Sequence, residues 1–147
     1  MSKITPILIF AGQANQAIEL YTKAFGANVI EKIFYSDANP KDLGIEDKDK
    51  YKDSIFWSEL KIGDQLISLA DDSNAIKNGI KGISGNSFLI DLLVHFDSDD
   101  ELKAAYETLS DGATITVPLC SQTYCSLTCA LIDKFGGRWQ LMSGYKG

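Results

Sequence analysis

Few side chains in this sequence could act as a base, a nucleophile or a metal ligand. His95 is the only histidine, and it stands at the end of an expected strand beside Asp97, which favours an ordinary surface residue. Asp91 is the more interesting candidate because it interrupts the apolar run Phe88–Val94, and an unpaired buried charge is costly. Asp91 could bind a polar ligand or act as a base with a raised pKa; alternatively, it is a hydrogen-bonded carboxylate at a wet sheet face.

The three cysteines, Cys120, Cys125 and Cys129, could indicate a metal site or a redox site. Their spacing matches no common zinc or iron–sulfur signature, and the usual fourth ligand is missing. On an expected strand, Cys125 and Cys129 would lie about 13 Å apart, which is too far for a disulfide without a bend. Buried structural cysteines are therefore favoured over a reactive thiol.

Aromatic and polar residues on the expected strands could line a pocket. Phe10, Trp57 and Tyr124 are aromatic residues on such strands, and one face of a curved sheet can form a pocket wall. Strand alternation puts Arg138 and Gln140 on the same face of the last strand. If Gln140 faces a pocket, Arg138 does too and could pair with an anionic group, although a solvated turn residue is the simpler interpretation.

Hydrophobic periodicity predicts two helices among a series of strands. The first helix, Gln13–Phe25, carries an apolar stripe and is followed by Gly26, a typical C-cap residue. The second helix, Ser98–Leu109, begins with a capping box formed by Ser98 and Glu101. The expected strands are Ile4–Phe10, Asn28–Tyr35, Ile55–Ile62, Gln65–Ala70, Phe88–Phe96, Ala113–Val117, Thr123–Ile132 and Arg138–Met142.

The two halves of the chain repeat one order of elements: a strand, a helix, Gly-Ala, a strand and a hairpin. The expected fold class is α+β, with two paired βαβββ modules forming a curved, cup-shaped mixed sheet with the helices on the outside. A single domain spans residues 1–147, with module one at 1–72, a linker at 73–85 and module two at 86–147. The polar segment Ser36–Asp53 is expected to be a solvated loop.

The composition limits the kinds of partner. With 14 Lys and Arg against 20 Asp and Glu, the formal net charge is -6, and no basic cluster offsets it. Nucleic acid binding is therefore disfavoured. The apolar runs are too short to cross a membrane and no signal peptide is evident, so the protein is expected to be cytoplasmic.

Three motifs spread along the chain resemble one family. They are Ile4–Pro6 with Ala17–Tyr21 and Ala24–Ala27, then Leu60–Asp64, and finally Asp133–Trp139, which reads Asp-x-Phe-Gly-x-x-Trp. Together they resemble PhnB-like proteins of the vicinal oxygen chelate superfamily, which includes glyoxalase I, bleomycin-resistance proteins and extradiol dioxygenases. The resemblance covers nearly the whole chain, and it implies paired βαβββ modules, usually in a homodimer.

Enzymes of this superfamily typically hold a divalent metal with His and Glu side chains from the sheet. The resemblance places Pro6, Ser68, Asp91 and Gln140 at or near the positions of these ligands. Only Asp91 among them is a strong metal ligand, and one carboxylate does not make a site for zinc, nickel or iron. The resemblance therefore implies a site without the superfamily metal, and no cofactor is predicted.

Three functions stay open. The first is a binding protein that holds or senses a small, partly aromatic molecule in a metal-free cup. The second is an enzyme with lyase, dioxygenase or transferase-like chemistry, using a metal through unrecognised ligands or Asp91 as acid or base. The third is an interaction protein whose cup is vestigial. The expected partners are an unknown small molecule and a second copy of the chain, and the residues expected to bind the ligand are Phe10, Trp57, Ser68, Asp91, Tyr124, Arg138 and Gln140.

Overall fold

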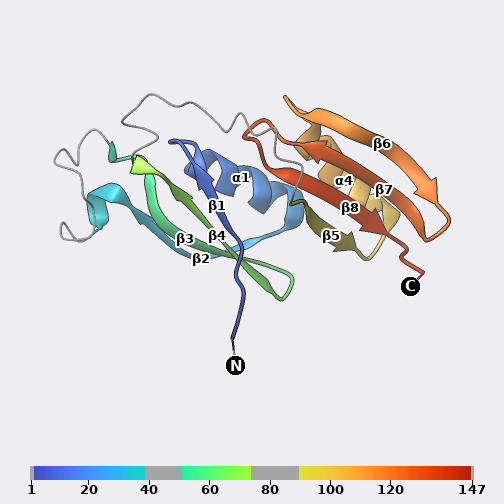
Figure 1. Ribbon diagram of the computed structural model, residues 1–147, viewed down its shortest axis with the longest axis horizontal. Helices are drawn as coiled ribbons and strands as arrows, with labels where there is room; N and C mark the ends of the chain where they lie inside the picture. Colours follow the sequence, from blue (N-terminus) through green and yellow to red (C-terminus); the bar gives the residue numbers. More distant parts are fainter. Residues whose placement is uncertain (1, 39–50, 74–89, 147) are drawn as a thin grey trace. The chain divides into compact units, whose positions relative to one another are not determined.

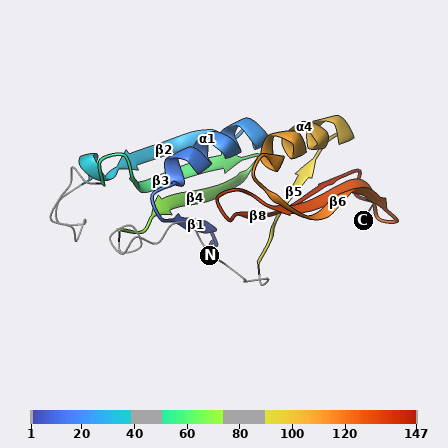
Figure 2. The same ribbon diagram turned by 90° about the horizontal axis from the view of Figure 1, so that it is seen from above.

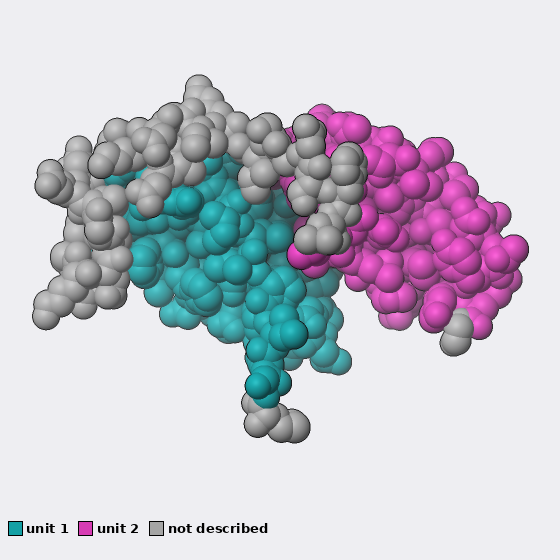
Figure 3. All heavy atoms as spheres, viewed as in Figure 1, with its two compact units in different colours: residues 1–83 teal, residues 84–147 magenta. Residues whose placement is uncertain are grey.

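The computed structural model describes residues 2–38, 51–73 and 90–146, which fall into two compact units, Met1–Ile83 and Ser84–Gly147 (Figure 3). Within these ranges, each unit contains one four-stranded sheet and one α-helix (Figure 1). Most of the expected loop at Ser36–Asp53 and of the expected linker at 73–85 lies outside the described residues. No helix in the described ranges is both long and apolar enough to span a membrane.

The first unit begins with a strand and a helix and continues with three strands, the first of which is followed by a short 3-10 turn. Its elements are β1 (Ile7–Phe10), α1 (Ala14–Phe25), β2 (Asn28–Phe34), η1 (Tyr35–Asp37), β3 (Ile55–Ile62) and β4 (Gln65–Asp71). The strand order in the sheet is β1-β4-β3-β2. Strand β1 runs parallel to β4, and the other neighbours are antiparallel.

The second unit has the same order of elements. They are β5 (Leu92–Phe96), α4 (Asp99–Ser110), β6 (Thr114–Gln122), β7 (Cys125–Ile132) and β8 (Arg138–Ser143). The strand order is β5-β8-β7-β6, again with one parallel pair, β5 with β8, and two antiparallel pairs. The shared topology confirms the predicted repeat of a βαβββ module.

Both helices form where the apolar period predicts them. The buried side of α1 is made by Ala14, Ala17, Ile18, Tyr21 and Ala24. Gly26 ends this helix in the left-handed conformation, with φ of 64°, and its N–H donates to the carbonyl of Thr22. Helix α4 begins as expected, because the Ser98 hydroxyl accepts a hydrogen bond from the Glu101 N–H at 3.2 Å.

Each sheet has one face that is covered by its own helix. Helix α1 packs on β3 and β4, and α4 packs on β5, β7 and β8 (Figure 2). Along β8, Trp139 and Leu141 are buried while Gln140 between them is exposed, so the two apolar residues face α4. We call the opposite face of each sheet its helix-free face. Arg138 and Gln140 both lie on the helix-free face of the second sheet.

Three predicted strand boundaries were wrong. The fourth expected strand ended at Ala70, but β4 continues to Asp71, which pairs with Phe10 in the parallel ladder. Tyr124 was expected on a strand, but the pairing of Gln122 with the start of β7 leaves it in the turn. Asp91 was expected inside an apolar strand, but β5 begins at the following residue.

Candidate functional site

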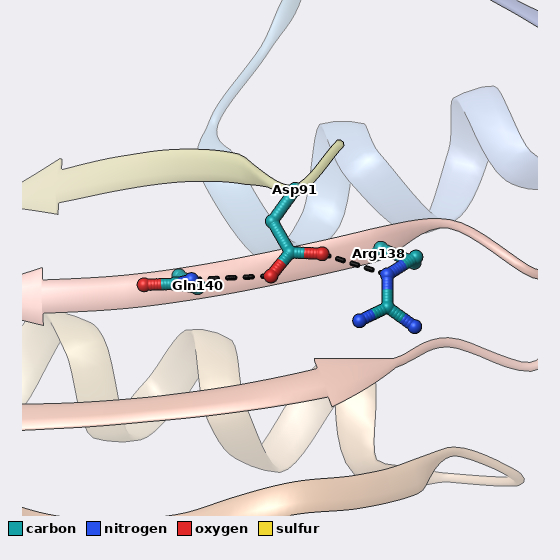
Figure 4. A network of polar contacts seen from close by, with 3 residues as sticks. All are labelled: Asp91, Arg138 and Gln140. Carbon is teal, nitrogen blue, oxygen red and sulfur yellow. Dashed lines mark hydrogen bonds and ion pairs between the residues drawn. The ribbon is translucent and has the colours of Figure 1, made fainter. Parts of the chain in front are cut away.

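Three polar side chains meet on the helix-free face of the second sheet: Asp91, Arg138 and Gln140 (Figure 4). The Arg138 Nε donates to Asp91 Oδ1 at 2.7 Å, which is also an ion pair. The Gln140 Nε2 donates to the other oxygen, Asp91 Oδ2, at 3.1 Å. Each carboxylate oxygen therefore has its own donor, and the three side chains form one connected cluster, which we call the Asp91 cluster.

The register of β5 on β8 brings this cluster together. Arg138 and Gln140 are two residues apart on β8, so they point to the same face. Leu93 lies opposite Gln140 in the parallel ladder, and Asp91, two residues earlier, reaches the same face. Residues 47 and 49 positions apart in the sequence thus become hydrogen-bonding neighbours.

The turn before β8 fixes the start of that strand. Asp133 is buried, and its Oδ1 accepts from the N–H groups of Phe135 and Gly137 at 2.8 and 2.9 Å. Its Oδ2 accepts from the indole N–H of Trp139 at 2.8 Å. These bonds join the first and last residues of the Asp-x-Phe-Gly-x-x-Trp motif. The motif therefore holds the turn that aims Arg138 at Asp91.

The electrostatics of the cluster keep Asp91 ionised. The hydrogen bond from Gln140 is the largest cause and lowers the pKa of Asp91. Burial comes second and raises this pKa, and the hydrogen bond and the charge of Arg138 lower it again, so the net shift is downward. The side chains of Asp91 and Arg138 are 24% and 18% exposed, so the pair lies at a partly solvated surface. Of the alternatives for Asp91, the base with a raised pKa is contradicted, because this pKa is lowered. The interpretation of Arg138 as a solvated turn residue was wrong, because Arg138 begins β8 and is half-buried.

The residues at the positions of the superfamily's metal ligands do not fit a metal ion. Pro6 offers no side-chain donor, and its carbonyl oxygen accepts from the N–H of Ser68 at 2.9 Å. Both oxygens of Asp91 are occupied, and Gln140 turns an amide N–H toward them. In the described part of the chain, no group of three or more His, Cys, Asp or Glu side chains could hold a metal. The Asp91 carboxylate at these positions accepts hydrogen bonds from a neutral amide and a cationic guanidinium in place of a metal ion.

The structure distributes the other predicted ligand-binding residues over different places. Phe10 is buried in the first unit, and its ladder partner Asp71 reaches the start of α1, so Phe10 does not lie on the helix-free face. Trp57 is 36% exposed and Ser68 is buried, and both face away from α1. Tyr124 is exposed in its turn.

The cysteines and the histidine take no part in the Asp91 cluster. Cys125 and Cys129 are buried free thiols, as predicted, and Cys120 is half-buried. Burial raises the pKa of Cys129 to about 11, so this thiol is a poor nucleophile. His95 is exposed, and its ring lies 5.9 Å from that of Tyr145.

Three other carboxylates have structural roles that were not predicted from the sequence. Asp71 Oδ1 accepts from the N–H groups of Gly12 and Ala14, and its Oδ2 accepts from that of Ile55 at 2.8 Å. Asp99 accepts from two serine hydroxyls of its unit, and Asp133 holds the turn described above. The only sequence signal for Asp71 was its place directly after an apolar strand.

The fold defines a class: proteins built from βαβββ modules with the glyoxalase/bleomycin resistance fold. The chain belongs to the family described as 3-demethylubiquinone-9 3-methyltransferase, whose model matches residues 2–142. This match and the solved structures below confirm the resemblance to PhnB-like proteins. None of the curated proteins compared with the chain matches it in sequence.

Solved structures from three bacteria share this fold. The chain is similar to protein PA1353 of Pseudomonas aeruginosa, with 23% identity, a TM-score of 0.76, and coverage of 97% of this chain and 98% of that one. It is also similar to a putative 3-demethylubiquinone-9 3-methyltransferase, PhnB protein, of Bacillus cereus. The identity is 23%, the TM-score is 0.71, and the match covers 97% of this chain and 99% of that one. A third similar structure is a glyoxalase/bleomycin resistance protein/dioxygenase family enzyme of Burkholderia phytofirmans PsJN. The identity is 15%, the TM-score is 0.61, and the match covers 94% of each chain. At these identities the likeness concerns the fold.

Proposed function

We propose that this protein binds a small molecule on the helix-free face of its second sheet, through the Asp91 cluster and without a metal ion. The observation that carries this proposal is the arrangement of Asp91, Arg138 and Gln140, in which a central carboxylate fixes one cationic and one amide side chain (Figure 4). Polar groups held in place beside apolar sheet residues are typical of small-molecule sites.

Binding is supported over acid–base chemistry by the state of Asp91. A general base needs a pKa near the working pH and a lone pair directed at the proton to be removed. The pKa of Asp91 is lowered instead, and each of its oxygens already accepts a hydrogen bond. The family description names a methyltransferase, but an ionised carboxylate, a guanidinium and an amide offer ligand positioning rather than a general base for the substrate. Our proposal therefore includes no cofactor.

The resemblance to PhnB-like proteins also supports a homodimer, and we include it in the proposal. Sedimentation velocity of the full chain checks this part independently, because a dimer has twice the mass of 16.1 kDa. A monomer at all protein concentrations would remove the homodimer and leave the binding site as proposed.

Two measurements test the binding site. In a fragment screen followed by ¹H–¹⁵N spectra, compounds that bind should shift amide signals of β5 and β8, including those of Asp91, Arg138 and Gln140. Elemental analysis of the purified protein should find no stoichiometric divalent metal. A full equivalent of tightly bound metal, or a diverse fragment library that shifts none of these signals, would contradict the proposal.

A further inference from the structure

We propose that the ligand donates a hydrogen bond, from an amide N–H or a hydroxyl group, to the side-chain carbonyl oxygen of Gln140, and that its apolar body lies across the neighbouring strands. This inference rests on the proposed function. It names the chemical class of the ligand, which is a molecule with a hydrogen-bond donor at one end, and it makes Gln140 the residue that selects this class.

The first argument is the orientation of the Gln140 amide. The two ends of a carboxamide are nearly equal in shape, but one donates and the other only accepts. The ionised Asp91 carboxylate can only accept, so Gln140 has to turn its NH₂ group toward it. The Gln140 Nε2 indeed donates to Asp91 Oδ2 at 3.1 Å. Figure 4 shows the Gln140 carbonyl oxygen on the far side of the amide, pointing away from Asp91.

The second argument is that Asp91 is itself held in the form that orients Gln140. Arg138 Nε donates to Asp91 Oδ1 at 2.7 Å, and this contact is also an ion pair. A protonated Asp91 could donate to the Gln140 oxygen and allow the amide to turn round. The pKa of Asp91 is lowered, so the carboxylate stays ionised near neutral pH. Asp91 and Arg138 are thus positioning residues in this inference.

The third argument is what the Gln140 oxygen lacks. Gln140 is exposed, and in the described part of the chain its side chain makes a single hydrogen bond, the one to Asp91. The carbonyl oxygen therefore accepts no hydrogen bond from these residues, although it has two lone pairs. A group that binds this oxygen has to supply an N–H or an O–H. An ionised carboxylate, a ketone and an ether supply neither.

The fourth argument is the apolar row beside Gln140. Leu93 on β5 and Ala130 on β7 lie opposite Gln140, and Val117 on β6 lies opposite Ala130. Leu93 and Val117 are 45% and 39% exposed. The row crosses all four strands of this sheet on its helix-free face. An apolar body attached to the donor group could cover these side chains and remove them from water.

The test uses the full chain and four probes: hexanamide, heptan-2-one, hexanoate and butanamide. Heptan-2-one has the shape and the carbonyl group of hexanamide, but a methyl group replaces the NH₂ donor. Binding is followed by ¹H–¹⁵N shifts and by calorimetry, and hexanamide should shift the signals of β5 and β8. Hexanoate should bind more weakly than hexanamide. Butanamide should also bind more weakly, by up to about fourfold for each methylene group that is buried.

The decisive quantity is the preference ratio, which is the dissociation constant of heptan-2-one divided by that of hexanamide. In Gln140→Met the length of the side chain is kept and its amide is lost. The preference ratio should fall by about 2- to 10-fold, because one hydrogen bond to the ligand is lost. Gln65→Met, at an exposed glutamine at the start of β4 in the first sheet, is the matched control and should leave the ratio unchanged.

Asp91→Asn tests the positioning role. A neutral asparagine can donate as well as accept, so the Gln140 amide would be free to turn round and present its NH₂ group to the ligand. The preference ratio should therefore fall in Asp91→Asn, although Gln140 is still present. A merely structural role of Asp91 would weaken the binding of both probes equally. Circular dichroism checks folding, and either variant alone tests the ratio if the other does not fold.

The inference fails if hexanoate binds the unaltered chain more tightly than hexanamide, or if Gln140→Met leaves the preference ratio unchanged. It also fails if hexanamide does not bind while other fragments shift the signals of β5 and β8, and in that case the proposed function stands. The proposed function itself falls, and this inference with it, if no compound of any class binds this face.

Discussion

The two units of the chain join helix to sheet with opposite arrangements of charge. In the first unit the carboxylate is on the strand: Asp71, at the end of β4, accepts from the N–H groups of Gly12 and Ala14 at the start of α1. In the second unit it is on the helix: Asp99, the first residue of α4, accepts from the hydroxyls of Ser126 and Ser143. The same topology therefore joins its helix to its sheet in two different ways.

The ladder register shows that these positions correspond. Asp71 pairs with Phe10 at the end of the first parallel ladder, and Ser143 pairs with Phe96 at the end of the second. Helix α1 has no side-chain cap of its own, whereas α4 is capped by Ser98. The first unit therefore depends on a distant strand residue for its helix start, and the second does not. This difference makes Asp71 the more sensitive position.

The largest expected effect is at Asp71. Asp71→Ala leaves three N–H groups, those of Gly12, Ala14 and Ile55, without the carboxylate and should lower the free energy of unfolding by about 3–5 kcal/mol. Urea denaturation measures this change. Asp64→Ala, at an exposed aspartate of the same unit, is the control and should cost less than about 0.5 kcal/mol. A loss of under about 1 kcal/mol for Asp71→Ala would contradict the claim that the start of α1 depends on Asp71.

The second expected effect compares the hairpin turns. Asp133→Ala removes the acceptor for two backbone N–H groups and the Trp139 indole, and should cost about 2–4 kcal/mol. The β3–β4 turn is the two-residue loop Gly63-Asp64, in which Asp64 is exposed, so the Asp64→Ala variant serves again as the comparison. Thermal or urea unfolding followed by the fluorescence of Trp57 and Trp139 measures the change. Equal losses at Asp133 and Asp64 would show that the motif does not hold its turn.

The third expected effect uses two glycines with the same backbone conformation. Gly26 and Gly144 have φ of 64° and 62°, so an alanine at either carries a similar left-handed strain of about 1 kcal/mol. A Cβ at Gly26 meets nothing within 4 Å, whereas at Gly144 it would collide with the Ser126 hydroxyl. Gly144→Ala should therefore be the more destabilising, at about 2–3 kcal/mol in urea denaturation. Equal losses for the two variants would mean that Ser126 moves aside without cost.

The smallest expected effect is the pH dependence that Asp99 adds. Hydrogen bonds from Ser126 and then Ser143 lower the pKa of Asp99 below 3.8. A lowered folded-state pKa gives stability that is present above pH 3.8 and is lost as the pH falls through the folded value. Asp99→Asn should flatten the loss of stability in this acidic range, measured by urea denaturation at several pH values.

Serine variants provide the control for that titration. The double variant Ser126→Ala and Ser143→Ala should flatten the acid dependence as Asp99→Asn does, because both donors to the carboxylate are gone. Ser121→Ala, at an exposed serine of β6, should leave the dependence as it is. An unchanged slope in the double variant would contradict the assignment of this effect to Asp99.

Local patterns predicted the elements well, because their causes lie within a few residues. The apolar stripe of α1, its end at Gly26 and the cap at Ser98 all depend on neighbours three or four positions away. The shared face of Arg138 and Gln140 likewise follows from strand alternation alone.

What the sequence could not predict depends on pairing between distant strands. Asp91 and Arg138 meet only because β5 lies beside β8 in one register, and no local pattern specifies that register. Asp71 was left outside the expected strand because a buried aspartate and an exposed one look alike until the N–H groups around it are known. Phe10 was assigned to a pocket because alternation separates two faces without saying which one the helix covers.

The turn held by Asp133 also affects how the binding site could change over evolution. Its hydrogen bonds reach the backbone of Phe135 and Gly137 and the ring of Trp139, and none of them uses the side chain of Arg138. A residue of the proposed binding site therefore lies inside a motif whose turn does not depend on it. Under the proposed function, a substitution at position 138 would change the ligand while the turn persists, so proteins that share this motif would differ in what they bind.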